Sequence, residues 1–111
     1  MAMTATQVLD RAREHLSDAG AVRWSDASLL DFLAQAVRLV YERRPDLLLD
    51  ESNALITVAV PAAVGDTIVL PDSFKEALEW MVAGRALAQD SHDQTNMERG
   101  AAYLQRGESL I

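Results

Sequence analysis

Few side chains in this sequence combine the residue types and spacing that catalysis or metal binding requires. The best candidate is His92 in the segment QDSHDQT, where Asp90 and Asp93 offer oxygen ligands to a cation. Acidic residues that follow a helix are usually part of a solvated loop, and we expect that here. The five glycines form no loop that cradles a phosphate. The sequence therefore predicts no catalytic residues, no cofactor and no metal site, and we expect the protein not to be an enzyme.

Two other ionisable side chains lie on or beside apolar helical stripes. Arg85 projects from the middle of a stripe formed by Phe74, Ala77, Leu78, Met81, Val82, Gly84 and Ala88. An arginine in this position either extends its charge to solvent or pairs with a buried carboxylate. We favour a structural ion pair for Arg85, with a partner that the sequence does not identify. His15 lies at the edge of an earlier apolar stripe, and we expect it to be a partly exposed packing residue.

Length and composition bound the remaining possibilities. The chain has 111 residues, half of them hydrophobic, which is enough for one domain over 1–111 with a modest core. Its formal net charge of −7 opposes nucleic-acid binding, because such binding depends on cations that displace counterions from phosphates. It contains no cysteine, which excludes disulfides and fits a cytosolic protein. No apolar run is long enough to span a bilayer, and we find no secretory signal.

The elements that must position these residues are mainly α-helical. Apolar periodicity predicts a first helix over about 5–18, at whose start Thr4 and Gln7 have the spacing of a capping box. A second helix starts at the N-cap Ser25 and stops before Pro45. A third helix follows Pro71, with Asp72 or Ser73 as its cap. A fourth runs over about 94–109, where Gly100 and Gly107 weaken it by roughly 1 kcal/mol each relative to alanine. We therefore expect a small four-helix domain whose last helix depends on docking.

One β-hairpin is expected between the second and third helices, at about 55–70. The segment ALITVAV alternates as a strand does, and TIVLP is a second short run. The turn residues of PAAVGD separate them, which predicts that Leu55–Val60 pairs with Thr67–Leu70. Two strands alone are marginally stable, so the hairpin must pack on the helices or pair with another chain.

The helices carry more apolar surface than one small core needs. On the second helix a narrow strip of Asp31, Gln35, Arg38 and Glu42 is polar, and well over half the circumference is apolar. The third and fourth helices also carry apolar side chains outside their main stripes. The residues that we expect in a protein interface are Trp80, Leu87, Tyr103, Leu110 and Ile111. For Trp80 and Leu87 the alternative is that they form the far side of a central helix.

The segment WSDASLLDFLAQAVRLVYERRPDLL resembles a pattern found in the head–tail adaptor proteins of tailed bacteriophages, also called connector or head-completion proteins. The matching residues are Trp24, Ser25, Asp26, Leu29, Leu30, Phe32, Leu33, Arg38, Val40, Arg44, Pro45 and Asp46. The block from Leu70 to Leu110 is similar to the C-terminal helical pair of this family. Its matching residues are Leu70, Pro71, Arg85, Ala86, Asp90 and Tyr103.

The resemblance implies a homo-oligomeric ring, usually of twelve subunits, bound under the portal protein of a phage capsid. Such a ring extends the DNA channel and carries the tail or its stopper protein. It implies a location in the virion neck after synthesis in the bacterial cytoplasm, with DNA passing without specific binding and no membrane contact. Relatives commonly place their C-terminal segment against the portal, which suggests the same for Leu110 and Ile111. The alternative is a small helical regulatory or antitoxin-like module that binds one protein partner through the same apolar face.

Overall fold

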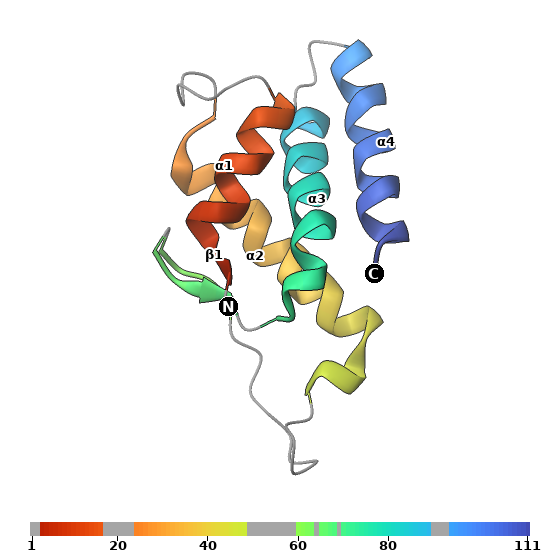
Figure 1. Ribbon diagram of the computed structural model, residues 1–111. Helices are drawn as coiled ribbons and strands as arrows, with labels where there is room; N and C mark the ends of the chain where they lie inside the picture. The colour runs from red at the N-terminus through yellow and green to blue at the C-terminus, as the bar shows by residue number, and fades with distance from the viewer. Residues whose placement is uncertain (1–2, 17–23, 49–59, 64, 69, 90–93) are drawn as a thin grey trace.

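The computed structural model describes residues 3–16, 24–48, 60–63, 65–68, 70–89 and 94–111. The described chain forms four α-helices and two short strands (Figure 1). The helices are α1 (Ala5–Leu16), α2 (Asp26–Arg43), α3 (Lys75–Ala88) and α4 (Gln94–Ser109), and the strands are β1 (Met3–Thr4) and β2 (Thr67–Ile68). Short 3-10 helices, Pro45–Leu48 and Asp72–Phe74, follow α2 and precede α3. The predicted mainly α fold is confirmed.

Local hydrogen bonds determine where α1 and α2 begin, as the sequence predicts. The backbone N–H of Gln7 donates to the Thr4 hydroxyl at 3.3 Å, and the Thr4 N–H donates to the Gln7 side-chain oxygen at 3.0 Å. This reciprocal pair is a capping box, which satisfies two N–H groups at the start of α1. Ser25 caps α2 by accepting a hydrogen bond from the Ser28 N–H at 3.1 Å. The helix ends ahead of Pro45, whose ring cannot continue it.

The start of α3 differs from the prediction. We expected Asp72 or Ser73 to cap the helix, but the N-cap residue is Phe74, which makes no side-chain capping hydrogen bond. A 3-10 turn precedes α3, and in it the Phe74 N–H donates to the Pro71 carbonyl oxygen at 3.0 Å. This backbone bond satisfies the Phe74 N–H ahead of α3 without a side-chain cap.

The two described strands pair in antiparallel orientation, and the buried side chains of Met3 and Ile68 lie opposite each other. The pair links the start of α1 to the segment between α2 and α3, a contact that the sequence analysis did not identify. Of the hairpin predicted from Leu55–Val60 and Thr67–Leu70, the second strand is present as β2. Residues 55–59 lie outside the described residues, so the pairing within that hairpin stays a prediction.

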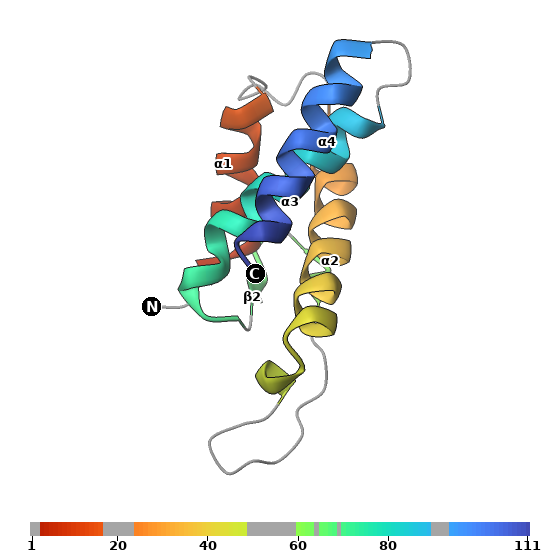
Figure 2. The same ribbon diagram turned by 90° about the vertical axis from the view of Figure 1, so that its right-hand side faces the viewer.

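The core forms around α3, which contacts each of the three other helices. Figure 2 shows α1 and α2 on opposite sides of α3, with α4 across it. The largest fully buried side chains are Val8, Leu29, Leu33, Val37, Val40, Ile68, Leu78, Met81 and Val82. None of these comes from α4, so α4 packs on the outside of a core that α1, α2, α3 and the strands build.

Glycines bring α3 and α4 unusually close. A Cβ added to Gly100 would lie 2.7 Å from the backbone nitrogen of Ala88 and 2.8 Å from the carbonyl oxygen of Gly84. A Cβ on Gly84 would in turn lie 2.9 Å from the Gly100 carbonyl oxygen, and one on Gly107 would lie 2.9 Å from that of Ala77. We had treated the glycines of α4 only as a loss of helix propensity. In the folded chain these glycines favour the packing of α4 on α3, because only a hydrogen at these positions permits the contact between the two backbones.

Candidate functional site

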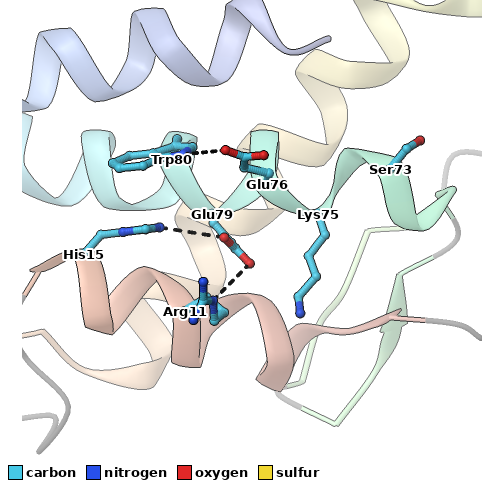
Figure 3. Close-up of a pocket in the computed structure, with 7 residues that line it drawn as sticks. All are labelled: Arg11, His15, Ser73, Lys75, Glu76, Glu79 and Trp80. Carbon is cyan, nitrogen blue, oxygen red and sulfur yellow. Dashed lines mark hydrogen bonds and ion pairs between the residues drawn. The ribbon is translucent and has the colours of Figure 1, made fainter.

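A groove of about 700 Å³, open to solvent, lies between α1 and the first half of α3 (Figure 3). We call it the α1–α3 groove, and its lining residues are Arg11, His15, Ser73, Lys75, Glu76, Glu79 and Trp80. Arg11 and His15 are four residues apart on α1, so they lie on the same face of that helix. On α3 the pairs Lys75–Glu79 and Glu76–Trp80 are also four residues apart and share a face. Tryptophan and arginine, both present in this groove, are enriched in protein contact surfaces.

Aromatic rings from three helices meet at the α4 side of this groove. The imidazole of His15 stacks on Trp80, with ring centroids 4.0 Å apart, and Tyr103 of α4 meets the indole edge-on at 4.8 Å. The Arg106 guanidinium lies 5.1 Å from the centroid of the Trp80 ring. His15 is a partly exposed packing residue, as predicted, and its partner is the indole. This aromatic cluster connects α1, α3 and α4 at the surface.

Glu79 places a carboxylate under the groove, with only 7% of its side chain exposed. Its oxygens lie 3.7 Å from Nε of Arg11 and 3.7 Å from Nε2 of His15, which is itself buried and without a hydrogen-bond partner. A buried carboxylate needs nearby positive charge or polar groups, and Glu79 lies between the Arg11 guanidinium and the His15 imidazole at the groove floor. Glu79 was not among the residues predicted from the sequence. The available signal was its place on the helical stripe of Ala83 and Ala86.

Arg85 forms a hydrogen bond with an amide side chain of α2. Its Nη1 donates to the side-chain oxygen of Gln35 on α2 at 2.9 Å, and no carboxylate of the described residues pairs with it. Its Nε is buried and has no hydrogen-bond partner there. α3 packs this side chain against the amide in the polar strip of α2, and the ion pair expected for Arg85 stays a prediction.

A buried arginine that the sequence analysis overlooked joins α1 to the start of α2. Arg13 donates from Nη1 to the Trp24 carbonyl oxygen at 2.8 Å and from Nη2 to the Asp26 carboxylate at 2.6 Å. The Trp-Ser-Asp motif of the phage-adaptor pattern thus has a structural explanation: Ser25 caps α2, and its two neighbours hold α1 in place.

The Arg-Pro-Asp motif also forms a local structure. Nε and Nη2 of Arg44 each donate to one oxygen of Asp46 at 3.1 Å, a two-point ion pair across Pro45. The hydrogen bond from Arg44 lowers the pKa of the Asp46 carboxyl, and the same bond raises the pKa of Arg44. The guanidinium lies 5.7 Å from the ring centroid of Phe74, so the motif orients the turn after α2 against the start of α3.

The predicted interface residues divide into buried and exposed ones. Leu87 is only 2% exposed and belongs to the core, so the alternative reading, the far side of a central helix, holds for it. Trp80 and Tyr103 are half-buried in the aromatic cluster, and each keeps an exposed part. Leu110 is 41% exposed, whereas Ile111 packs partly against the core. Met97 on α4 is also 41% exposed.

The structure also shows where the many apolar side chains of α2 lie. One side of the helix is buried against α1 and α3, and Leu30, Phe32 and Leu39 beside it stay half-buried. Asp31, Arg38 and Glu42 are exposed, and we call these three residues the α2 outer strip. No hydrogen bond or ion pair joins Glu42 to another described residue. The outer strip is thus a second charged surface, separate from the α1–α3 groove.

The arrangement offers contact surfaces for another protein. Within the described ranges, no three His, Asp or Glu side chains gather where they could hold a metal ion. The candidate cluster at Asp90, His92 and Asp93 lies outside those ranges. Nor does a described helix have the length and apolar content to cross a membrane.

Comparison with known proteins identifies one relationship. A family model described as SU10 adaptor protein matches residues 3–109. No curated protein and no solved structure matches the chain.

Proposed function

The chain belongs to the SU10 adaptor protein family, a family of phage head-to-tail adaptors, and we propose that it is a structural protein of the virion neck that forms a ring under the portal. The family match over residues 3–109 is the observation that carries this proposal. It includes both sequence blocks on which the resemblance to adaptor proteins was based. It also includes the capped start of α2 and the Arg-Pro-Asp turn, whose side chains have structural roles.

A ring of like subunits, which we expect to number twelve, needs surfaces that remain exposed after the single chain has folded. Several exposed surfaces of this chain support ring formation. Outside the core lie Trp80 and Tyr103 of the aromatic cluster, the half-buried side chains of α2 and the exposed Met97. Aromatic and methionine side chains are enriched in subunit interfaces, because they bury much apolar area when a partner covers them.

Contact with the portal is proposed for the end of α4. Leu110 is exposed, and the adjoining Ile111 is packed only in part. An apolar side chain at the end of a helix gains free energy when a partner covers it, by about 2 kcal/mol for a leucine. We propose that this end of the molecule docks on the portal and that another surface of the ring receives the tail or stopper protein.

The DNA channel is the third part of the proposal. The chain carries a formal net charge of −7, so a ring of twelve copies would surround the channel with a strongly negative field. Phosphates would be repelled from the wall, and DNA would pass without binding to it. This suits a passive extension of the portal channel.

The test is electron cryo-microscopy of the virion neck, with native mass spectrometry of the purified protein mixed with its portal. The proposal expects a closed ring of this chain in register with the portal ring and a mass that corresponds to it. A neck that lacks this chain, together with no binding to the portal, would refute the proposal.

A further inference from the structure

A closed ring imposes a requirement on the surface of each subunit. Every copy must contact the next through one surface and the previous copy through a different one, because rotation around a ring makes the interfaces head-to-tail. The two surfaces must therefore complement each other in charge and lie on different sides of the molecule. Two surfaces of this chain meet these conditions.

The first surface is the α1–α3 groove, with Lys75 at its mouth. Lys75 forms no hydrogen bond or ion pair with any described residue, although Glu76 and Glu79 follow it on the same helix. Glu79 is engaged with Arg11 of α1, and Glu76 accepts hydrogen bonds from Trp80 and Arg106. Figure 3 shows the lysine extended toward α1, and no dashed line joins it to Glu76 or Glu79. The groove thus presents an unpaired cation in a chain whose overall charge is negative.

The second surface is the α2 outer strip. Glu42 is exposed and unpaired among the described residues, whereas Asp31 accepts a hydrogen bond from Gln35 at 3.1 Å. Glu42 therefore has the freer carboxylate. It lies near the C-terminal end of α2.

The two surfaces face away from each other. In Figure 1 α1 lies in front and α2 behind, and Figure 2 shows the same two helices on opposite sides of α3. The end of α2 and the start of α3 lie toward the same end of the molecule (Figure 1). Rotation about an axis roughly parallel to the helices keeps residues at the same height, so it brings the end of one α2 to the start of the next α3.

We propose that neighbouring copies of this chain meet with the α2 outer strip of one in the α1–α3 groove of the next, where Glu42 pairs with Lys75. This inference rests on the proposed ring. The carboxylate would enter the groove beside Lys75 and Arg11, and the half-buried Trp80 would lie under the contact. Both surfaces carry charges of both signs, but the unpaired Lys75 on one and the unpaired Glu42 on the other favour the head-to-tail arrangement over a symmetric dimer, in which each would meet its own copy.

Disulfide trapping tests the geometry, because the chain contains no cysteine that could interfere. The variant Lys75→Cys with Glu42→Cys, assembled with the portal and oxidised, is expected to give a ladder of covalent oligomers on a non-reducing gel. Each single cysteine variant should stay monomeric on the same gel. The matched control is Lys75→Cys with Asp31→Cys, which moves the second cysteine three turns along the same helix and should give little cross-linking.

Charge reversal tests the energetics. Lys75→Glu and Glu42→Lys should each raise the protein concentration for half-assembly about tenfold at low salt, since attraction becomes repulsion. The double variant should recover most of this loss, and the difference should shrink at high salt. Far-ultraviolet circular dichroism of each variant checks that the fold is kept, which is expected because both side chains are partly or fully at the surface.

The results separate this inference from the proposed function. If the wild-type chain forms a ring on the portal but the Lys75–Glu42 cysteine pair gives no ladder, or gives no more than the control pair, the interface is wrong and the adaptor function stands. Dimers from a single cysteine variant would indicate a symmetric contact and also overturn the interface. If the wild-type chain neither assembles nor binds the portal, the proposed function fails and the interface fails with it.

Discussion

Replacement of Gly100 by alanine should destabilise the protein, although alanine is the better helix former. In an exposed helix this change would gain about 1 kcal/mol of stability from helix propensity. Here the new Cβ would lie 2.7 Å from the backbone nitrogen of Ala88 and 2.8 Å from the carbonyl oxygen of Gly84. Neither atom belongs to a flexible side chain, so the strain can be relieved only by moving α4 away from α3.

The size of the effect follows from the two opposing terms. Overpacking of a tight contact costs about 1–3 kcal/mol. The propensity gain offsets about 1 kcal/mol of this, which leaves a net loss of up to about 2 kcal/mol. For a domain of this size a change of 1 kcal/mol moves the melting temperature by about 4–8 °C. A loss of several degrees is therefore expected.

Thermal and urea unfolding, followed by circular dichroism, measure this change, and hydrogen exchange along α4 reports whether the helix loosens locally. Gly65→Ala is the control, because no atom lies within 4 Å of its added Cβ. That variant should be neutral or slightly stabilising. A Gly100→Ala protein that melts about as high as the control, or higher, would refute the close-packing argument and restore the view that this glycine only weakens the helix.

Three other outcomes are expected. Leu33→Ala should cost about 2–5 kcal/mol, because Leu33 is fully buried, and an unchanged melting temperature would remove it from the core. The purified protein should not bind duplex DNA near physiological salt, since its net charge is −7, and micromolar affinity in fluorescence anisotropy would contradict a passive channel. Removal of Leu110 and Ile111 should leave the fold nearly intact and weaken attachment to the portal. Native mass spectrometry measures that attachment, and full binding by the shortened chain would argue against docking through this end. The deletion starts at Leu110 because Gly107 is buried against Met81 on α3, so a longer deletion would also disturb the α3–α4 contact.

The sequence by itself determined the features that depend on neighbours within about one helical turn. The capping box of Thr4 and Gln7, the N-cap Ser25 and the stop at Pro45 are found where the sequence predicts them. So is the burial of Leu33, since the apolar period of α2 identifies its inner face. These features need only hydrogen bonds and side-chain spacing along one segment, and both can be read from consecutive residues.

The tertiary structure decided which residues from distant segments meet. Periodicity places Trp80 and Leu87 on one side of α3, but it does not say that α1 and α4 leave the indole half exposed and that the core covers the leucine. Charged side chains on apolar stripes, such as Glu79, depend in the same way on polar and charged partners supplied by another helix, here Arg11 and His15.

The glycines of α4 show the physical reason most directly. Along one helix, Gly100 is a residue of poor helix propensity, and nothing in its own segment indicates more. Once α3 lies against it, the missing Cβ is what allows the two backbones to touch. Helix propensity belongs to the segment and can be predicted from it. The distance between two helices depends on the side chains of both, and only the folded chain brings those side chains together.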